Sequence, residues 1–122
     1  MDCFLVVSTN AFKTTDGSAV EMSDFYEELD YRLNRISGPS FLWYVEYIKD
    51  EEIHIYYRHS GPITRDEFDT LIKEGVLPIF KSLKVKGTSF VYNESAELKI
   101  HIWAHQAPNP CTEVPSGYIG GR

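Results

Sequence analysis

Two of the four histidines in this chain stand four residues apart, within the segment KIHIWAHQAPNPC at residues 99–111. On a helix, that spacing would bring the side chains of His101 and His105 onto one face, about 6 Å apart, where both could bind one metal ion. On a strand, the two residues share a face but lie roughly 13 Å apart, at about 3.3 Å per residue. Zinc needs each ligand nitrogen within about 2.1 Å, so strand histidines at that distance cannot share it. Apolar and polar residues alternate around His101, which predicts a strand and therefore no metal site.

A shorter histidine pattern occurs twice, as HIY at residues 54–56 and HIW at residues 101–103. Histidines that face one pocket from neighbouring strands can act as general acid and general base on a phosphodiester. This interpretation makes the protein a small enzyme or ligand-binding protein for a phosphate-containing nucleotide or RNA. Its site residues would be His54, His101, Tyr56 and Arg58, with Glu46 orienting a histidine. No glycine-rich phosphate loop opens an expected helix, and no nucleophile has a recognisable local setting.

The composition predicts one folded, acidic domain. The chain has 122 residues, of which 43% are hydrophobic and 14% aromatic, as is typical of globular proteins. Its 18 acidic and 12 basic residues give a net charge of −6. Because phosphate neutralisation supplies most of the nonspecific affinity for nucleic acids, this balance argues against a nucleic-acid binder. It suits solubility, or attraction to the basic surface of a protein partner.

Cysteine usage and the N-terminal segment predict the compartment. The two cysteines, Cys3 and Cys111, are too few for a disulfide scaffold and favour a reducing environment. Cys3 lies in an apolar run and is expected to be buried. The segment MDCFLVVSTN begins with an acid, and its apolar run is shorter than the ~7–15 residues of a signal peptide. We expect a cytoplasmic protein that binds no membrane and no cofactor.

Runs of β-branched and aromatic residues predict five strands. The first is apolar throughout and suits a central strand buried on both faces. The second and third are joined at Asp50-Glu51 as a hairpin, with Phe41, Trp43, Val45 and Tyr47 of one strand and Ile53, Ile55 and Tyr57 of the other facing the core. The last two are expected to form a second hairpin, and the residues after the first strand a polar loop. The five strands are predicted at residues 3–8, 40–49, 52–59, 88–92 and 97–105.

Two helices are predicted from apolar periodicity and capping signals. The first spans 23–37, with Ser23 as its N-cap and an apolar stripe on one face. The second spans 64–74 and begins with a capping box, in which Thr64 is followed three residues later by Glu67. Gly75 and Pro78 should then stop or kink the helix and leave a short second piece ending near Leu83.

The order β-α-β-β-α-β-β predicts an α+β fold. A ferredoxin-like split β-α-β two-layer sandwich fits this order, with an antiparallel sheet and two helices on one of its faces. We expect residues 1–105 to form this single domain. Residues 106–122 contain three prolines and three glycines, and are expected to form an irregular C-terminal tail.

If the helices cover one face of the sheet, its other face presents a mixed aromatic and charged surface. Tyrosine, tryptophan and arginine are the residue types enriched at protein interfaces. Aromatic residues on a sheet also stack RNA bases, although this face has few basic residues for that role. The first helix adds an acidic surface that suits a basic target. The residues expected on the sheet face are Tyr44, Glu46, His54, Tyr56, Arg58, Lys99, His101, Trp103 and His105.

These observations favour a small acidic binding protein over an enzyme. It would act by stoichiometric protein–protein contact, as inhibitors, immunity proteins and phage counter-defence proteins do. The acidic balance suits a partner with a basic surface, and a homodimer through the sheet face or an edge strand is a second expectation. The alternative is the phosphate-directed enzyme or ligand-binding protein that uses the sheet-face histidines.

Overall fold

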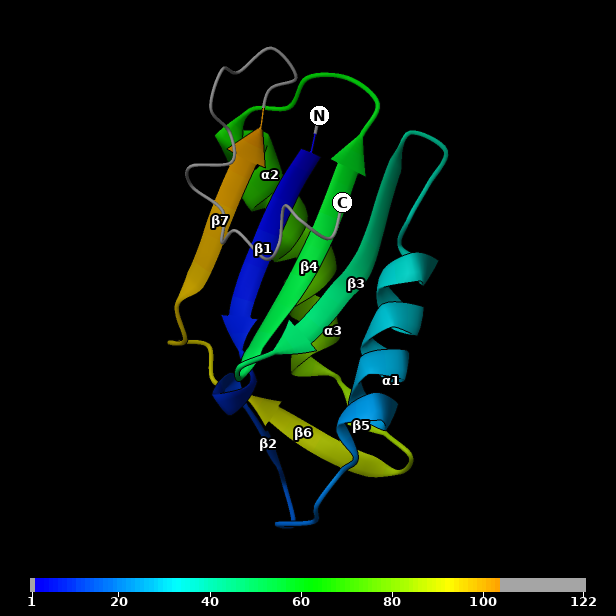
Figure 1. The fold of residues 1–122 in the computed structure, drawn as a ribbon, viewed down its shortest axis with the longest axis vertical. Helices are drawn as coiled ribbons and strands as arrows, with labels where there is room; N and C mark the ends of the chain where they lie inside the picture. Colours follow the sequence, from blue (N-terminus) through cyan, green and yellow to red (C-terminus); the bar gives the residue numbers. More distant parts are fainter. Residues whose placement is uncertain (1, 104–122) are drawn as a thin grey trace.

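The computed structural model describes residues 2–103 (Figure 1). His105, Cys111 and the predicted tail at 106–122 therefore lie outside the described residues. No helix within residues 2–103 is long and apolar enough to span a membrane. The strands are β1 (Asp2–Ser8), β2 (Phe12–Thr14), β3 (Phe41–Lys49), β4 (Glu52–His59), β5 (Lys84–Val85), β6 (Thr88–Tyr92) and β7 (Leu98–Trp103). The helices are α1 (Met22–Arg35), α2 (Arg65–Leu71) and α3 (Leu77–Lys81), with a 3-10 turn at Thr9–Ala11 and a π-helical turn at Ile72–Val76.

The fold is α+β, with two antiparallel sheets. The larger sheet has the strand order β3-β4-β1-β7, and the smaller has the order β2-β6-β5. Figure 1 shows α2 and α3 behind the larger sheet, α1 beside β3, and the smaller sheet at one end. Side chains of α1, α2 and α3 join one apolar cluster with the alternate residues Cys3, Leu5 and Val7 of β1, so the helices share one face of the larger sheet.

Strand β1 occupies the interior of the larger sheet, as its apolar sequence predicts. It pairs with β4 on one side and β7 on the other, both antiparallel. Cys3 through Val7 are all buried, so both of its faces are covered. The prediction of a central strand buried on both faces is confirmed.

The predicted second hairpin is wrong. Strand β6 pairs with β2 and β5, while β7 pairs with β1. The segment after β1, predicted to be a polar loop, includes β2. Long-range apolar packing explains both differences: the ring centroids of Phe12 and Tyr92 lie 5.1 Å apart, and Leu98, Ile100 and Ile102 pack against the main core.

The hairpin of β3 and β4 is confirmed, but its register contains a bulge. Lys49 pairs with Glu52 across a two-residue turn in which Asp50 and Glu51 have φ angles of 54° and 62°. Positive φ at both central residues is typical of the tight hairpin turns whose twist matches the strands. The register shifts between Val45 and Tyr47, because Glu46 is the extra residue. Tyr47 was predicted to face the core, and the bulge instead turns it to the opposite face, where it packs with the cluster around Phe4.

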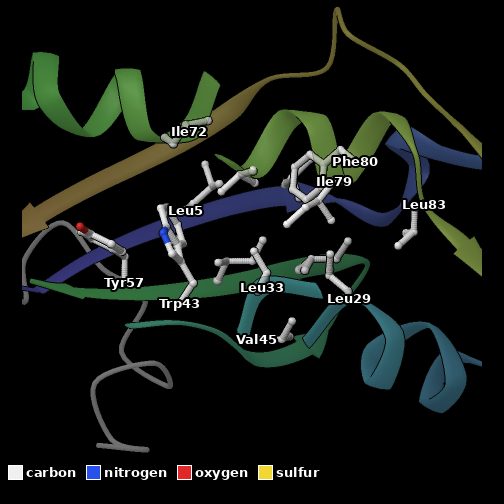
Figure 2. Packing of buried hydrophobic residues seen from close by; sticks show 14 of the residues in the cluster. Leu5, Leu29, Leu33, Trp43, Val45, Tyr57, Ile72, Ile79, Phe80 and Leu83 are labelled. Carbon is white, nitrogen blue, oxygen red and sulfur yellow. The ribbon is translucent and has the colours of Figure 1, made fainter. Parts of the chain in front are cut away.

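The core lies between the larger sheet and the helices (Figure 2). Its centre is aromatic: the ring centroid of Trp43 lies 4.4 Å from that of Tyr57 and 5.8 Å from that of Phe68. The predicted apolar stripe of α1 is buried here through Phe25, Leu29 and Leu33. Burial of an aliphatic or aromatic side chain contributes roughly 1.5–3 kcal/mol, so this layer supplies much of the stability of the fold.

Helix α1 begins earlier than predicted. Its N-cap is Glu21, whose side chain makes no capping hydrogen bond, and Ser23 lies within the first turn. The backbone carbonyl of Glu21 already accepts hydrogen bonds from the N–H groups of Asp24 and Phe25. The start of this helix is thus set by its backbone and by the burial of Phe25, and no side-chain cap determines it.

The capping box of α2 is confirmed. The N–H of Glu67 donates to Thr64 Oγ1 at 3.1 Å, and the N–H of Thr64 donates to Glu67 Oε1 at 2.9 Å. The predicted interruption near Gly75 and Pro78 is present as the π-helical turn, after which the chain continues as α3. Pro78 falls in the first turn of α3, where its missing N–H costs no helical hydrogen bond.

The outer edge of β3 is closed by side chains of α1 and the residues that follow it. The N–H of Val45 donates to Asp30 Oδ1 at 2.7 Å, and the hydroxyl of Tyr26 donates to the carbonyl of Val45 at 2.9 Å. The N–H of Trp43 donates to Ser37 Oγ at 2.8 Å. An exposed edge strand is a template for aggregation, and these bonds satisfy two donors and one acceptor on this edge.

We expect Asp30→Ala to destabilise the protein by about 1–3 kcal/mol, because the N–H of Val45 would lose its acceptor in a partly buried site. Asp30→Asn keeps an acceptor oxygen and should lose less. Glu27→Ala, an exposed acid on the same helix, is the control. Urea unfolding at neutral pH measures all three, and equal stability of the Asp30→Ala and Glu27→Ala proteins would show that the edge cap contributes nothing.

Candidate functional site

The strand register gathers the predicted sheet-face residues into rows that cross the four strands from β3 to β7. The middle row contains an aromatic ring on each of its first three strands, and the outer two rows carry the charges. The rows are Leu42, Arg58, Asp2 and Trp103; Tyr44, Tyr56, Phe4 and His101; and Tyr47, His54, Val6 and Lys99.

The centre of this face is buried. Tyr56 is 2% exposed, His54 is 3% exposed and Phe4 is fully buried, although the sequence analysis expected Tyr56 and His54 on an open surface. Ring packing contributes to this burial: the ring of Phe4 meets Tyr56 edge-on at a centroid distance of 4.9 Å, and the ring centroids of Tyr44 and Tyr56 lie 5.1 Å apart. Edge-to-face ring pairs add about 0.5–1.5 kcal/mol to the burial itself. The buried rings therefore form the base of this face, and its exposed side chains, such as Arg58 and Lys99, lie around them.

Arg58 occupies one end of the face and is held by two neighbours. Its Nε lies 3.2 Å from Asp2 Oδ1, and its Nη2 donates to the hydroxyl of Tyr56 at 3.0 Å. The Arg58 side chain is nevertheless 59% exposed. Burial raises the pKa of Tyr56, and the nearby Asp2 carboxylate raises it further, so the phenol is neutral and can accept this hydrogen bond. The guanidinium is therefore held in one orientation although it is exposed.

Glu52 organises the opposite end of the face. Its Oε1 lies 3.2 Å from His54 Nε2, and its Oε2 lies 3.4 Å from Lys99 Nζ. The ring of Tyr47 packs on His54 at a centroid distance of 4.4 Å. Burial lowers the pKa of His54, the hydrogen bond and charge of Glu52 oppose that shift, and the nearby His101 and Lys99 add to the lowering. The net lowering leaves His54 neutral at pH 7.

The structure does not place His54 and His101 on neighbouring strands. His54 of β4 pairs with Val6 and His101 of β7 pairs with Phe4, so β1 lies between them. Two strand spacings and two residues along the strand separate their Cα atoms by about 12 Å. The proton relay predicted for this pair requires adjacent strands. Glu46, its predicted orienting residue, is the extra residue of the β3 bulge.

Neither a metal-binding cluster nor a reactive thiol is found within residues 2–103. Within residues 2–103, no group of three or more His, Cys, Asp or Glu side chains is arranged to hold a metal ion. Cys3 is buried as predicted, and burial raises the pKa of its thiol to about 12. A thiol with that pKa is protonated at neutral pH and is a poor nucleophile.

Sequence reasoning identified Tyr44, Arg58 and Lys99 on this face but missed Asp2, Phe4, Glu52 and Tyr47. Phe4 carried a usable signal, because a central strand buried on both faces must have an apolar cover on each. A comparison of the chain with protein-family models, curated proteins and solved structures found no match. A proposal about function must therefore rest on the structure of this chain alone.

The lowered pKa of His54 predicts that acid destabilises the fold. Between its unfolded pKa near 6.5 and its lower folded pKa, the unfolded chain binds more protons, so stability falls as the pH falls through this window. One histidine can contribute a slope of at most about 1.4 kcal/mol per pH unit. We expect His54→Gln to flatten the dependence of the unfolding free energy on pH between 7.5 and 5, measured by urea titration.

The control for this experiment is His59→Gln, a half-buried histidine at the end of β4 whose ring approaches Tyr57 of the main core. A slope lost only in the His54→Gln protein assigns the acid sensitivity to the buried ring. If the His54→Gln protein keeps the wild-type slope, the buried histidine is not the group that senses acid.

Proposed function

We propose that this chain is a small acidic binding protein that acts by stoichiometric protein–protein contact, in the manner of inhibitors, immunity proteins and phage counter-defence proteins. The observation that carries the proposal is the fixed, exposed guanidinium of Arg58 beside a packed aromatic row. We also propose a cytoplasmic location, which agrees with the buried thiol of Cys3.

The arrangement has the features of an interface centre. Arginine and tyrosine dominate binding energy at interfaces because they combine apolar area with directional hydrogen bonds. Here Arg58 is oriented by Asp2 and Tyr56, Leu42 is 41% exposed next to it, and Tyr44 is half-buried. Side chains that are already ordered lose little entropy on binding, which favours affinity.

The charge of the chain suggests the kind of partner. A net charge of −6 favours encounter with a basic surface, because long-range attraction raises the association rate. A second copy of this chain is a different candidate partner, through the same face or through the edge strand β7.

We further assign the larger sheet and its helices to the ferredoxin-like split β-α-β arrangement. The order β3-β4-β1-β7 and the antiparallel pairing of all its neighbours support this assignment. The small sheet of β2, β6 and β5 would then be an addition at one end. The assignment concerns architecture and leaves the function open, since many activities share such a fold.

The alternative is an enzyme or ligand-binding protein that acts on a phosphate-containing molecule. The exposed cations Arg58 and Lys99 on one face support it, since both side chains bind phosphate. It has weaker support than protein binding, because His54 is buried and β1 lies between the two histidines.

The test is affinity capture of the tagged protein from its native host, followed by native mass spectrometry of what is bound. We expect a complex of fixed stoichiometry. Arg58→Ala should weaken it about 30-fold, the effect of losing a hot spot worth roughly 2 kcal/mol. Arg65→Ala is a matched control on α2, since Arg65 is 60% exposed and also pairs with an aspartate.

Unchanged affinity in the Arg58→Ala protein would remove this face from the proposal. Co-purification of a phosphate-containing small molecule, with no captured protein, would favour the alternative. Circular dichroism should show that both arginine variants are folded.

A further inference from the structure

A second surface lies away from the sheet face, where β2, β6 and the start of α1 meet (Figure 1). A cavity of about 370 Å³ opens there. Small binding pockets in proteins typically enclose about 300–1,000 Å³, so this one has room for a single large side chain or a small molecule. Three phenylalanines line it: Phe12, Phe25 and Phe90.

The phenylalanines form a rigid floor. The ring of Phe25 meets both Phe12 and Phe90 edge-on, each at a centroid distance of 5.4 Å. Phe12 is in turn held by Phe80 and Tyr92, both at 5.1 Å. Because these rings are packed from behind, the cavity exists before a ligand binds and costs little reorganisation to fill.

The wall of the cavity is a loop fixed by short-range hydrogen bonds. The hydroxyl of Thr14 donates to the carbonyl of Ser18 at 2.9 Å, and the N–H of Ser18 donates to Asp16 Oδ1 at 2.9 Å. Gly17 between them has a φ of +78°, a conformation that side chains disfavour. The N–H of Thr15 pairs with the carbonyl of Ser89, which ties this loop to β6.

Apolar side chains also line the entrance. Met22 lines the cavity and is 50% exposed, and Val20 is half-buried beside it. Methionine is flexible and polarizable, which suits a surface that adapts to an incoming apolar group. Met22 is thus an accessible apolar side chain at a cavity whose floor is aromatic.

The charges around the entrance are mostly negative. Lys13 is the one charged residue among those that line the cavity. Asp16 belongs to the wall loop, where its carboxylate accepts the N–H of the lining residue Ser18, and Glu21 stands in the chain between the lining residues Val20 and Met22. Asp24, the next acid of α1, is neutralised by Lys86 at 3.2 Å. Lys13, Asp16 and Glu21 together carry one net negative charge, in a chain whose total charge is −6.

We propose that this cavity receives one large apolar side chain from a basic segment of a protein partner. The aromatic floor and Met22 supply the apolar contact, and Asp16 and Glu21 attract the flanking positive charges. Amphipathic basic peptides are recognised in the same physical way by methionine-lined grooves next to acidic residues. The inference rests on the proposed function in one respect, that the ligand is a protein, but its surface is separate from Arg58 and the sheet face.

The test uses three synthetic peptides as probes, each blocked at both ends: Lys-Lys-Phe-Lys-Lys, Lys-Lys-Ala-Lys-Lys and Glu-Glu-Phe-Glu-Glu. Each is titrated into the full-length ¹⁵N-labelled protein. We expect the first peptide to shift the amide signals of Gly17, Ser18 and Met22 and to bind at least about tenfold more tightly than the other two.

Two matched variants locate the binding. Met22→Lys adds a positive charge at the entrance and should weaken the basic phenylalanine peptide at least about tenfold. Tyr31→Lys makes the same change at an exposed apolar residue farther along α1 and should leave its affinity unchanged. Both sites are substantially exposed, so neither change should disrupt folding.

Several outcomes would overturn the proposal. Equal affinity for the phenylalanine and alanine peptides would show attraction by charge alone, and equal affinity for the acidic peptide would show a small apolar-ligand site. Shifts of the same signals on raising the protein concentration, with no peptide present, would identify a second copy as the occupant. If no peptide binds, while a partner is captured in an Arg58-dependent way, the cavity proposal fails and the proposed function stands.

Discussion

The burial of β1 on both faces is the constraint on which the rest of the structure depends. Its alternate residues Cys3, Leu5 and Val7 face the helices, and Phe4 and Val6 face the other way. Phe4 and Val6 therefore need other apolar side chains packed against them on that face. The rings of Tyr44, Tyr47 and Tyr56 gather beside Phe4 and help to supply this packing. The candidate face is thus a second, smaller core, whose polar groups are displaced to its two ends.

This displacement explains how the charges are arranged. At one end Asp2 orients Arg58, and at the other Glu52 orients both His54 and Lys99. Each carboxylate satisfies a polar group that would otherwise lie beside aromatic rings. One arginine and one lysine are left exposed and positioned, so the same residues that stabilise the face also define its contact chemistry.

Much of the local structure was predictable because its signals are local. The capping box of Thr64 and Glu67, the turn at Asp50-Glu51 and the interruption near Pro78 depend on neighbouring residues alone. The exposure of His54 and the facing of Tyr47 were mispredicted for longer-range reasons. One extra residue at Glu46 reverses the alternation of β3, and no local pattern announces such a bulge. The pairing of β7 with β1, in place of β6, depends on which distant apolar faces meet, so the sequence order of the strands does not determine it.

The acidic residues of α1 show that the number of charges on a helix does not by itself locate a binding site. Asp30 accepts the hydrogen bond of an edge strand, and Asp24 pairs with Lys86, so two acids of this helix serve the fold. Glu21 is different, because its side chain makes no capping hydrogen bond and it stands in the chain between Val20 and Met22, which line the phenylalanine cavity. An acid near an apolar cavity affects which ligands approach, because it attracts positive charge and repels negative charge. Asp16 has both roles, because its carboxylate accepts the Ser18 N–H and also adds negative charge to the wall of the cavity. The charge available for recognition therefore differs from the total acid count, since most acids of this region are already paired within the fold.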